Sequence, residues 1–382
     1  MTGLEERIKR KALDLGFEVV GITNVGRMSG HDKALRDWCD AGFAAGMTYM
    51  TRRPELNANP QLLVPWAASV ITLAVNYWAP APSFDHESRY GRVARYAWGR
   101  DYHYVVKPRL LALAAEIEGL AARPLRARAF VDAVPLLERA VAAQAGLGFF
   151  GKNTNLLQPR RGSWFFLAEL LVDMPLESQG EPIKVSCGSC RRCLEACPTG
   201  AFAGAYVLDS RRCISYLTIE NKGAIPAEFR AGLGEWIFGC DVCQDVCPFN
   251  RFSSETTWPE LGPEAGVGHR LDLVDLLSVA SDREFRNRFG GTPLVRAKRK
   301  GLLRNAALVA ANVNCTDAIS ALITRIEEEA EPLIRGHALW ALSLLDRGTG
   351  KRLAERAIER DSDPFVVEEA TGILENRRAS AL

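Results

Sequence analysis

Residues 187–198 read Cys-Gly-Ser-Cys-Arg-Arg-Cys-Leu-Glu-Ala-Cys-Pro. This spacing, C-x2-C-x2-C-x3-C-P, is typical of bacterial ferredoxins, in which three cysteines bind one 4Fe-4S cluster and the fourth binds a second cluster. Three thiolates within seven residues suit a cuboidal cluster better than zinc, whose tetrahedral sites usually take two ligands from each of two separated loops. The stretch therefore predicts an iron–sulfur domain, and metal is expected to hold this loop-rich domain together.

A second, incomplete copy of the motif follows at residues 240–248, Cys-Asp-Val-Cys-Gln-Asp-Val-Cys-Pro. It lacks a first cysteine, and Cys213 can supply the missing ligand. The crossed arrangement of two-cluster ferredoxins assigns four cysteines to each cluster. The first set is Cys187, Cys190, Cys193 and Cys247, and the second set is Cys213, Cys240, Cys243 and Cys197. The remaining two cysteines, Cys39 and Cys315, stand alone and receive no role.

The sequence on either side of the cysteines predicts two further domains. Residues 1–180 alternate apolar, strand-like runs with amphipathic helical stretches, which predicts an α/β (α+β) domain. The strands are expected at 17–22, 69–77, 129–131 and 164–172, and helices at 107–120 and 136–145. Residues 181–255 are expected to form the ferredoxin-like two-cluster domain. Within 256–382, helical segments recur about every thirty residues, which predicts an all-α domain of HEAT-like repeats.

Composition places the chain among ordinary soluble proteins. It has 382 residues, a net charge of +2 and 47% hydrophobic residues, so any anionic partner must be met by a local basic patch. Its start, MTGLEERIKRKAL, is charged and lacks the apolar core of an export signal. We therefore expect a cytoplasmic protein with no membrane association, in which the thiols stay reduced.

Two clusters in series could carry electrons to a further redox centre, and the sequence excludes some candidates for it. The C-x3-C-x2-C spacing of radical S-adenosylmethionine sites is absent, and so is a G-x-G-x-x-G loop after a strand. Two alternatives stay open on spacing alone. These are a corrinoid bound without an axial histidine and a flavin bound by scattered contacts.

Five stretches outside the two cysteine motifs resemble the epoxyqueuosine reductase family. They are RYAWGRDYH at 95–103, VD and LERA within 131–140, GLGFFGKNTN at 146–155, GSWFFLAE at 162–169 and RCISYLT at 212–218. The resemblance implies a cobalamin-dependent oxidoreductase related to reductive dehalogenases. Such an enzyme performs the last step of queuosine synthesis, removing the epoxide oxygen of epoxyqueuosine at the wobble position of tRNA. Low-potential clusters could feed the cofactor, because this deoxygenation consumes two electrons.

The same resemblance implies site residues. Asp132 is the expected proton donor, and Asp101, His103 and Tyr96 are further catalytic candidates. No histidine ligand to cobalt is expected, since position 106 is Val and the D-x-H-x-x-G motif is not completed. The expected cobalamin contacts are Asn57, Arg95, Asp132, Arg139, Gly151, Lys152, Asn153, Asn155, Leu156, Ser215 and Tyr216. Near Asn57 the chain lacks a basic residue that many relatives have.

Residues 283–304 hold eight Lys or Arg residues against one Glu, which indicates a phosphate-contacting edge. The alternative is a solvated helix face. The expected RNA contacts are Lys222, Arg296, Lys298, Arg299, Lys300 and Arg304. An RNA-bound substrate needs its backbone gripped while the modified base enters a pocket.

Two other functions compete with this one. A reductive dehalogenase would use the same cofactors on a small molecule, but such enzymes usually begin with a twin-arginine signal, which this chain lacks. A non-catalytic electron carrier would need no corrinoid pocket. The electron donor stays unidentified, with a flavodoxin or ferredoxin type expected, and a monomer is the default oligomeric state.

Overall fold

The computed structural model describes residues 3–82, 88–178 and 180–375. The chain divides into two compact units, each assembled from several segments. Unit 1 comprises Met1–Pro80, Gly99–Arg211 and Val242–Gly266, and unit 2 comprises Ala81–Trp98, Arg212–Asp241 and Val267–Leu382. This division differs from the three consecutive domains that the sequence predicted at 1–180, 181–255 and 256–382. The cysteine-rich stretch is shared between the units, because its segments pack with different parts of the chain.

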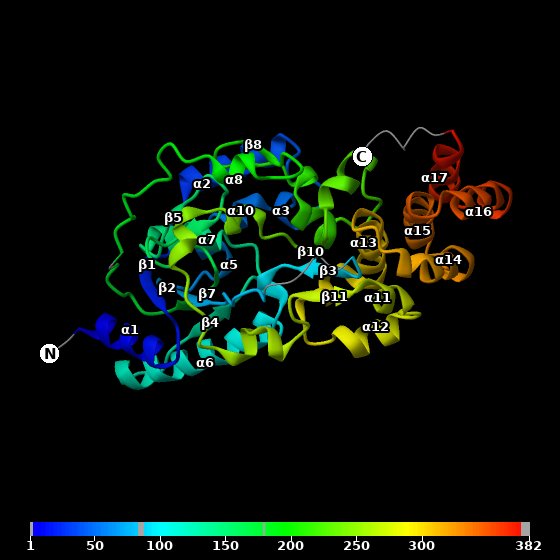
Figure 1. The fold of residues 1–382 in the computed structure, drawn as a ribbon. Coiled ribbons are helices and arrows are strands. Elements are labelled where there is room, and N and C mark those ends of the chain that lie inside the picture. The colour runs from blue at the N-terminus through cyan, green and yellow to red at the C-terminus, as the bar shows by residue number, and fades with distance from the viewer. Residues whose placement is uncertain (1–2, 83–87, 179, 376–382) are drawn as a thin grey trace. The chain divides into compact units, whose positions relative to one another are not determined.

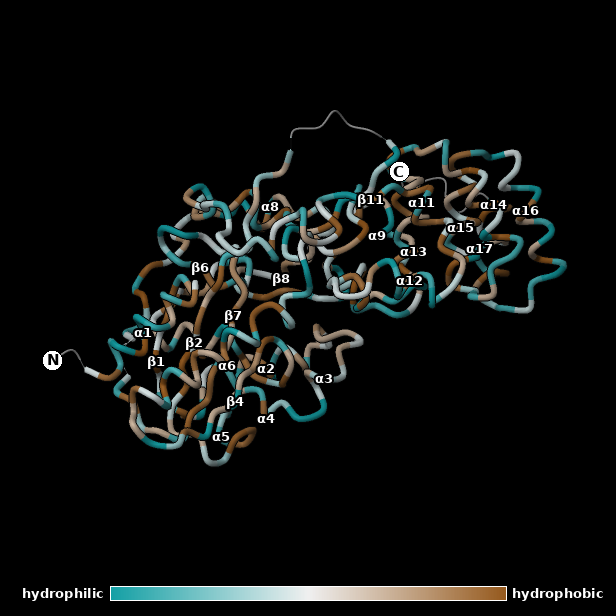
Figure 2. Tube along the Cα trace, turned by 90° about the horizontal axis from the view of Figure 1, so that it is seen from below, coloured by the Kyte–Doolittle hydropathy of each residue, from teal (hydrophilic) through white to brown (hydrophobic). Residues whose placement is uncertain are grey.

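Unit 1 is built on a four-stranded antiparallel sheet with the order β1-β2-β7-β4. The strands are β1 Val19–Asn24, β2 Ser69–Asn76, β7 Phe165–Val172 and β4 Ala127–Phe130. The two central strands are buried along almost their whole length, which agrees with their largely apolar sequence. Figure 2 shows both in brown, the colour of hydrophobic residues. All four predicted strands are confirmed, with ends shifted by a few residues.

Helices cover both faces of this sheet. Tyr102 of α6 (Tyr102–Ala121) stacks on Phe166 of β7, with ring centroids 4.1 Å apart. On the opposite face, α7 (Glu138–Gln144) packs its alanines against Leu167 and Leu171. Successive residues of a strand point to opposite faces, so Glu169 of β7 points to the α7 side. Both helices were predicted, and α6 begins five residues earlier than expected.

Shorter elements complete unit 1 and carry its loops (Figure 1). The helices are α1 Leu4–Asp14, α2 Ser29–Asp40, α3 Thr48–Thr51, α4 Pro54–Asn57, α5 Pro60–Leu63, α8 Arg192–Glu195 and α10 Val242–Asp245. Two small hairpins pair β5 Phe149–Phe150 with β6 Leu156–Leu157, and β8 Phe202–Gly204 with β9 Val207–Leu208.

Unit 2 combines a small sheet with a helical array. Its central strand, β3 (Tyr90–Val93), pairs in parallel with β10 (Trp236–Phe238) and antiparallel with β11 (Arg270–Asp272). The helices are α9 Ala227–Arg230, α11 Leu273–Ser278, α12 Asp282–Phe289, α13 Lys298–Asn312, α14 Ile319–Glu328, α15 Pro332–Leu345, α16 Arg347–Arg360 and α17 Pro364–Leu374. Figure 1 shows α13 to α17 stacked side by side, in orange to red.

The sequence segments that carry this repeat begin at Arg304, Arg335 and Pro364, and they lie in α13, α15 and α17, with α14 and α16 between them. Each buries apolar residues against its neighbours, as stacked helix pairs do. Their assignment to the HEAT class stays a prediction. In the part of the chain that the structure describes, no helix combines the length and apolar character that a membrane span requires.

Candidate redox active site

Four cysteines of unit 1 line a single cavity. They are Cys187, Cys190 and Cys193 of the first motif and Cys247 of the second, together with Lys152, Asn153, Leu157, Pro248 and Phe249. The crossed ligand set is thus assembled around one space, as a cubane cluster requires. Burial raises the pKa of the Cys193 thiol, and the neighbouring thiols raise it further. Metal would remove this cost by binding the thiolates.

The loop between β5 and β6 holds the first cysteine motif in place. The backbone N–H of Lys152 donates to Cys187 Sγ at 3.4 Å. The Lys152 ammonium donates to the carbonyls of Gly188 at 2.6 Å and Cys190 at 3.0 Å. These three bonds of Lys152 position the cysteine loop, and its expected contact with cobalamin stays a prediction.

Asn153 links the same loop to the second cysteine motif. Its side-chain amide donates to the carbonyl of Cys243 at 3.2 Å, and its Oδ1 accepts the N–H of Asn155. A Cβ at position 151 would lie 2.7 Å from Asn153 Oδ1, so a larger residue than Gly151 would displace the Asn153 side chain. Leu156 begins β6 and is buried in the core. The 151–155 loop therefore contacts both cysteine motifs.

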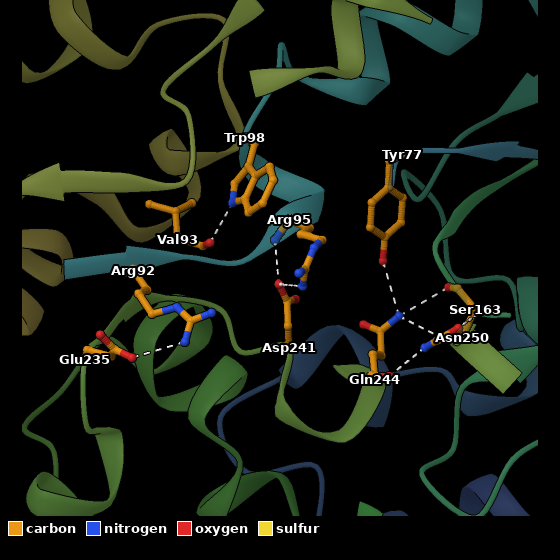
Figure 3. Close-up of polar contacts among 10 residues, drawn as sticks. All are labelled: Tyr77, Arg92, Val93, Arg95, Trp98, Ser163, Glu235, Asp241, Gln244 and Asn250. Carbon is orange, nitrogen blue, oxygen red and sulfur yellow. Dashed lines mark hydrogen bonds and ion pairs between the residues drawn. The ribbon is translucent and has the colours of Figure 1, made fainter. Parts of the chain in front are cut away.

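A polar network that the sequence analysis missed holds the Cys243–Cys247 turn (Figure 3). Gln244 donates to the Oγ and the carbonyl of Ser163, and Asn250 donates to Ser163 Oγ and to the carbonyl of Gln244. Figure 3 also shows the hydroxyl of Tyr77 facing the Gln244 amide, at 3.4 Å. Partly buried side-chain networks of this kind favour one geometry when every member is paired.

Asp132 lies just after β4, in a left-handed conformation with φ of +46°. Aspartate tolerates this region better than most residues. The phenolic O–H of Tyr102 donates to Asp132 Oδ2 at 2.5 Å. The backbone N–H of Asp132 donates to Glu138 Oε1 at 2.7 Å. Asp132 is otherwise exposed, so its carboxyl can meet a ligand.

The expected catalytic pair Asp101 and His103 is assembled at the start of α6. Asp101 caps the helix by accepting the N–H of His103, and it also contacts His103 Nδ1 at 2.7 Å. This hydrogen bond raises the pKa of His103, and the charge and backbone of Asp132 raise it further. The imidazole thus favours its protonated form beside Asp132, where it could stabilise a carboxylate.

Two further predicted residues lie near Asp132. Arg139 donates to the carbonyl of Thr154 at 2.6 Å, which joins α7 to the 151–155 loop. Arg139 is exposed at the surface, but desolvation by the surrounding protein lowers its pKa, while the charges of Asp132 and Glu138 oppose that effect. Asn57 is buried and accepts the N–H of Leu137 on its carbonyl at 2.8 Å. Unit 1 therefore brings Asn57, Asp132, Arg139 and the 151–155 loop together.

Unit 2 carries the remaining predicted site residues. Arg95 is buried, and its backbone N–H and guanidinium both donate to Asp241, the residue after Cys240 (Figure 3). Arg95 therefore positions the Cys240 segment. The ring of Tyr96 lies 6.1 Å from the ring of Phe238. Ser215 and Tyr216 are half-buried beside Cys213.

The structure corrects two of the predicted RNA contacts. Arg304 is fully buried and donates to the carbonyls of Leu217, Asn221 and Gly223, while burial lowers its pKa to about 9. Arg299 is buried and paired with Glu329. Both side chains point into unit 2, so neither can reach a phosphate. Arg304 instead anchors the segment that follows Cys213.

The other four basic candidates lie nearer the surface. Lys298 is exposed, and Lys300 is half-buried within 3.7 Å of Glu331. Arg296 is exposed and paired with Glu220, and the Lys222 ammonium donates to the carbonyl of Arg296. These four keep their predicted role.

The second predicted cluster set is divided between the units. Cys197 and Cys243 belong to unit 1, whereas Cys213 and Cys240 belong to unit 2. Within unit 1, Cys197 Sγ accepts the N–H of Ala201 at 3.3 Å. The joining of these four cysteines at one cluster stays a prediction.

Comparison with known proteins identifies the family. Residues 186–250 match the family described as 4Fe-4S double cluster binding domain, which confirms the prediction of two clusters, and residues 58–133 match the family described as Epoxyqueuosine reductase QueG, DUF1730. The chain is 42% identical over 346 residues to epoxyqueuosine reductase of Pseudomonas aeruginosa, covering 89% of this chain and 94% of that one.

Solved structures agree with that match. One is epoxyqueuosine reductase with an epoxyqueuosine-modified tRNA stem loop, with a TM-score of 0.89, 32% identity and coverage of 97% of this chain and 98% of that one. Another is the enzyme from Bacillus subtilis with its catalytic loop swung out of the active site, with a TM-score of 0.85, 32% identity and the same coverage. This chain belongs to the epoxyqueuosine reductase family.

Proposed function

We propose that this protein reduces epoxyqueuosine to queuosine in tRNA, with electrons passing through its two 4Fe-4S clusters. Family membership supports the reaction, and the relative bound to a modified stem loop supports the substrate. The observation that carries the proposal is a continuous set of contacts in unit 1. The 151–155 loop bonds to both cysteine motifs and to Arg139, and the preceding residue in α7, Glu138, holds the Asp132 loop.

The reaction breaks both C–O bonds of the epoxide, forms a carbon–carbon double bond and releases the oxygen as water. It therefore consumes two electrons and two protons. In this proposal Asp132 supplies a proton to the departing oxygen. Tyr102 orients the carboxyl through its hydrogen bond, and the protonated His103 stabilises the carboxylate that remains.

Cobalamin is the proposed electron acceptor, and the residues present fit it. The side chain of Asn155 has no hydrogen-bond partner among the described residues, and the guanidinium of Arg139 has further N–H groups beyond the one that bonds Thr154. Amide and guanidinium groups match the peripheral amides and the phosphate of a corrinoid. Asn57, Arg95, Gly151, Lys152, Asn153, Leu156, Ser215 and Tyr216 complete the proposed contact set. When bound, reduced cobalamin supplies a strong nucleophile and reductant.

The proposal also includes an electron donor, an oligomeric state and an RNA-binding surface. A flavodoxin or ferredoxin type protein delivers the electrons, and the enzyme works as a monomer in the cytoplasm. The helical repeats of unit 2 are of the HEAT-like class and present basic side chains to the RNA backbone.

A direct assay tests the reaction. Protein reconstituted anaerobically with iron and sulfide, then supplied with cobalamin and a reductant, is expected to convert epoxyqueuosine to queuosine in tRNA. Mass spectrometry of the digested nucleosides measures the product. Turnover of small organohalides with no action on tRNA would favour a dehalogenase, and cluster reduction with no corrinoid binding would favour an electron carrier. Either result would overturn the proposal.

The basic residues that lie near the surface of unit 2 give a second expected result. Replacing Lys298 and Lys300 together with Ala should weaken tRNA binding and lower the salt dependence of log K by about one per lost phosphate contact. Filter binding over a range of salt concentrations measures both effects. Lys351→Ala, an exposed change on α16 of the same unit, is the matched control. If the double variant and the control bound tRNA with equal affinity, Lys298 and Lys300 would belong to a solvated helix face that does not contact RNA.

A further inference from the structure

Two glutamates beside Asp132 have no role in the reaction as described so far. Glu138 begins α7, and its Oε1 accepts the backbone N–H of Asp132 at 2.7 Å. Glu169 lies in the middle of β7 and is completely buried, with 0% exposure. It points to the α7 face of the sheet, and its carboxyl meets that of Glu138.

A hydrogen bond between two carboxyl groups needs one proton, because two carboxylates have only acceptor atoms. Among the described residues no cation bonds to Glu169, and the charge of nearby Asp132 is negative. Thr72 Oγ1 donates to its Oε1 at 3.4 Å, and its Oε2 has no donor among the residues that the structure describes. An ionised and unpaired carboxylate at this depth would be costly. A hydrogen bond between the Glu138 and Glu169 carboxyl groups therefore needs a shared proton.

The charged groups that face this pair are few. Asp132 adds negative charge on the Glu138 side, and Arg139, the next residue of α7, adds positive charge. Glu169 has Glu138, Thr72 and Asp132 around it. No cation bonds directly to either glutamate in the described chain, so a shared proton is the available means of neutralising one carboxyl.

We propose that Glu138 is a positioning residue that holds Asp132 in its left-handed conformation, and that a proton shared with Glu169 keeps Glu138 in place. The conformation of Asp132 depends on this contact, since its N–H is fixed by Glu138 while Tyr102 fixes its carboxyl. Without the hydrogen bond to Glu138, the left-handed backbone of Asp132, with φ of +46°, is less stabilised. The importance of this for turnover rests on the proposed role of Asp132 as proton donor.

The pair should act as a pH-dependent lock. Burial, followed by the charge of Asp132, raises the pKa of Glu138 to about 8, and burial also raises the pKa of Glu169. Below that pH one carboxyl is protonated and the contact holds. As the pH rises through about 8 the proton is lost, the two adjacent anions repel, and Glu138 releases the Asp132 N–H.

The sign of the stability change follows from the same shift. Between the ordinary glutamic acid range and about pH 8, the folded protein binds a proton that the unfolded chain has released. The free energy of unfolding therefore falls as pH rises over this interval. Glu169→Gln should flatten that fall, because an amide donates to Glu138 without a titrating proton.

Hydrogen exchange of the peptide that contains Asp132 tests the lock without tRNA or cobalamin. In the cluster-loaded protein, the amide should be protected at neutral pH and lose protection above about pH 8, relative to the intrinsic exchange rate. Glu138→Gln should keep the protection to higher pH, since its amide can both accept from Asp132 and donate to Glu169. Glu138→Ala should lose protection at every pH. Glu116→Gln, which alters a surface ion pair on α6, is the matched control.

Turnover measured across pH gives the second readout. Glu138→Ala should lower kcat on the order of 10- to 100-fold, the scale of a misplaced catalytic group. Glu169→Gln should move the alkaline decline of kcat upward. The pH-dependent contact would be contradicted if protection of the Asp132 amide did not change with pH and was the same in wild type, Glu138→Gln and Glu169→Gln. If protection behaves as expected but Glu138→Ala retains full turnover, the lock stands and the role of Asp132 as donor fails.

Discussion

Asp132→Asn is expected to lower the rate of epoxyqueuosine reduction by about 10²- to 10⁴-fold, the usual contribution of a positioned general acid. The amide oxygen can still accept the Tyr102 hydroxyl that now bonds Asp132 Oδ2 at 2.5 Å, so the loop should keep its conformation. What the variant loses is the transferable proton. Single-turnover conversion of modified tRNA, followed by nucleoside mass spectrometry, measures the effect.

The control for this variant is Asp173→Asn, just beyond β7. Asp173 accepts the N–H of Arg126 and pairs with Arg123, away from the site, so its replacement should leave the rate unchanged. Both variants should retain the visible absorption of the clusters. A rate for Asp132→Asn within a few-fold of wild type would contradict the assignment, and the proton would then come from another group or from water.

Cys247→Ser is expected to abolish turnover and to remove the same cluster that Cys187→Ser removes. Both thiols line one cavity although they lie in different motifs. A protein with two 4Fe-4S clusters should lose about half of its iron in either variant. Electron transfer should stop, since each electron must pass through the clusters. Iron analysis and electron paramagnetic resonance of the reduced protein measure the loss.

Cys39→Ser serves as the matched control, because Cys39 of α2 is half-buried and its thiol only faces the carbonyl of Met50. Its replacement should leave iron content and spectra unchanged. The crossed ligand set would be contradicted if Cys247→Ser gave the same spectrum as Cys240→Ser. Cys247 would then bind the same cluster as Cys240. A fully folded variant with no loss of iron would contradict the cluster assignment for this cavity.

The sequence identified Asp132 but not the residues that position it. Glu138 lies within the LERA stretch that carried the family resemblance, yet nothing local marks it as the acceptor of the Asp132 N–H. Its partner Glu169 sits in an otherwise apolar strand, and a charged residue among buried neighbours was the one available signal. Gln244 and Asn250 give no comparable signal, because their network with Ser163 joins segments that are remote in sequence.

The basic stretch of unit 2 shows how far a charge pattern can mislead. Lys298, Arg299 and Lys300 are consecutive, but only Arg299 is buried against Glu329. Arg304 lies one turn further and enters the interior of unit 2, where backbone carbonyls satisfy its guanidinium. The direction of each side chain depends on the helix turn and on what packs against it, which composition does not encode.

The residue pattern was enough to predict the cluster chemistry, the main sheet and its two covering helices, and the family. These features show in local patterns: the cysteines of each motif lie within a few residues of one another, and a buried strand needs only its own apolar run. The tertiary structure alone decided which segments form each unit, which cations are buried, and that Glu138 and Glu169 share one site. Burial and hydrogen-bond pairing are properties of two segments in contact, so they arise only when the chain brings distant residues together.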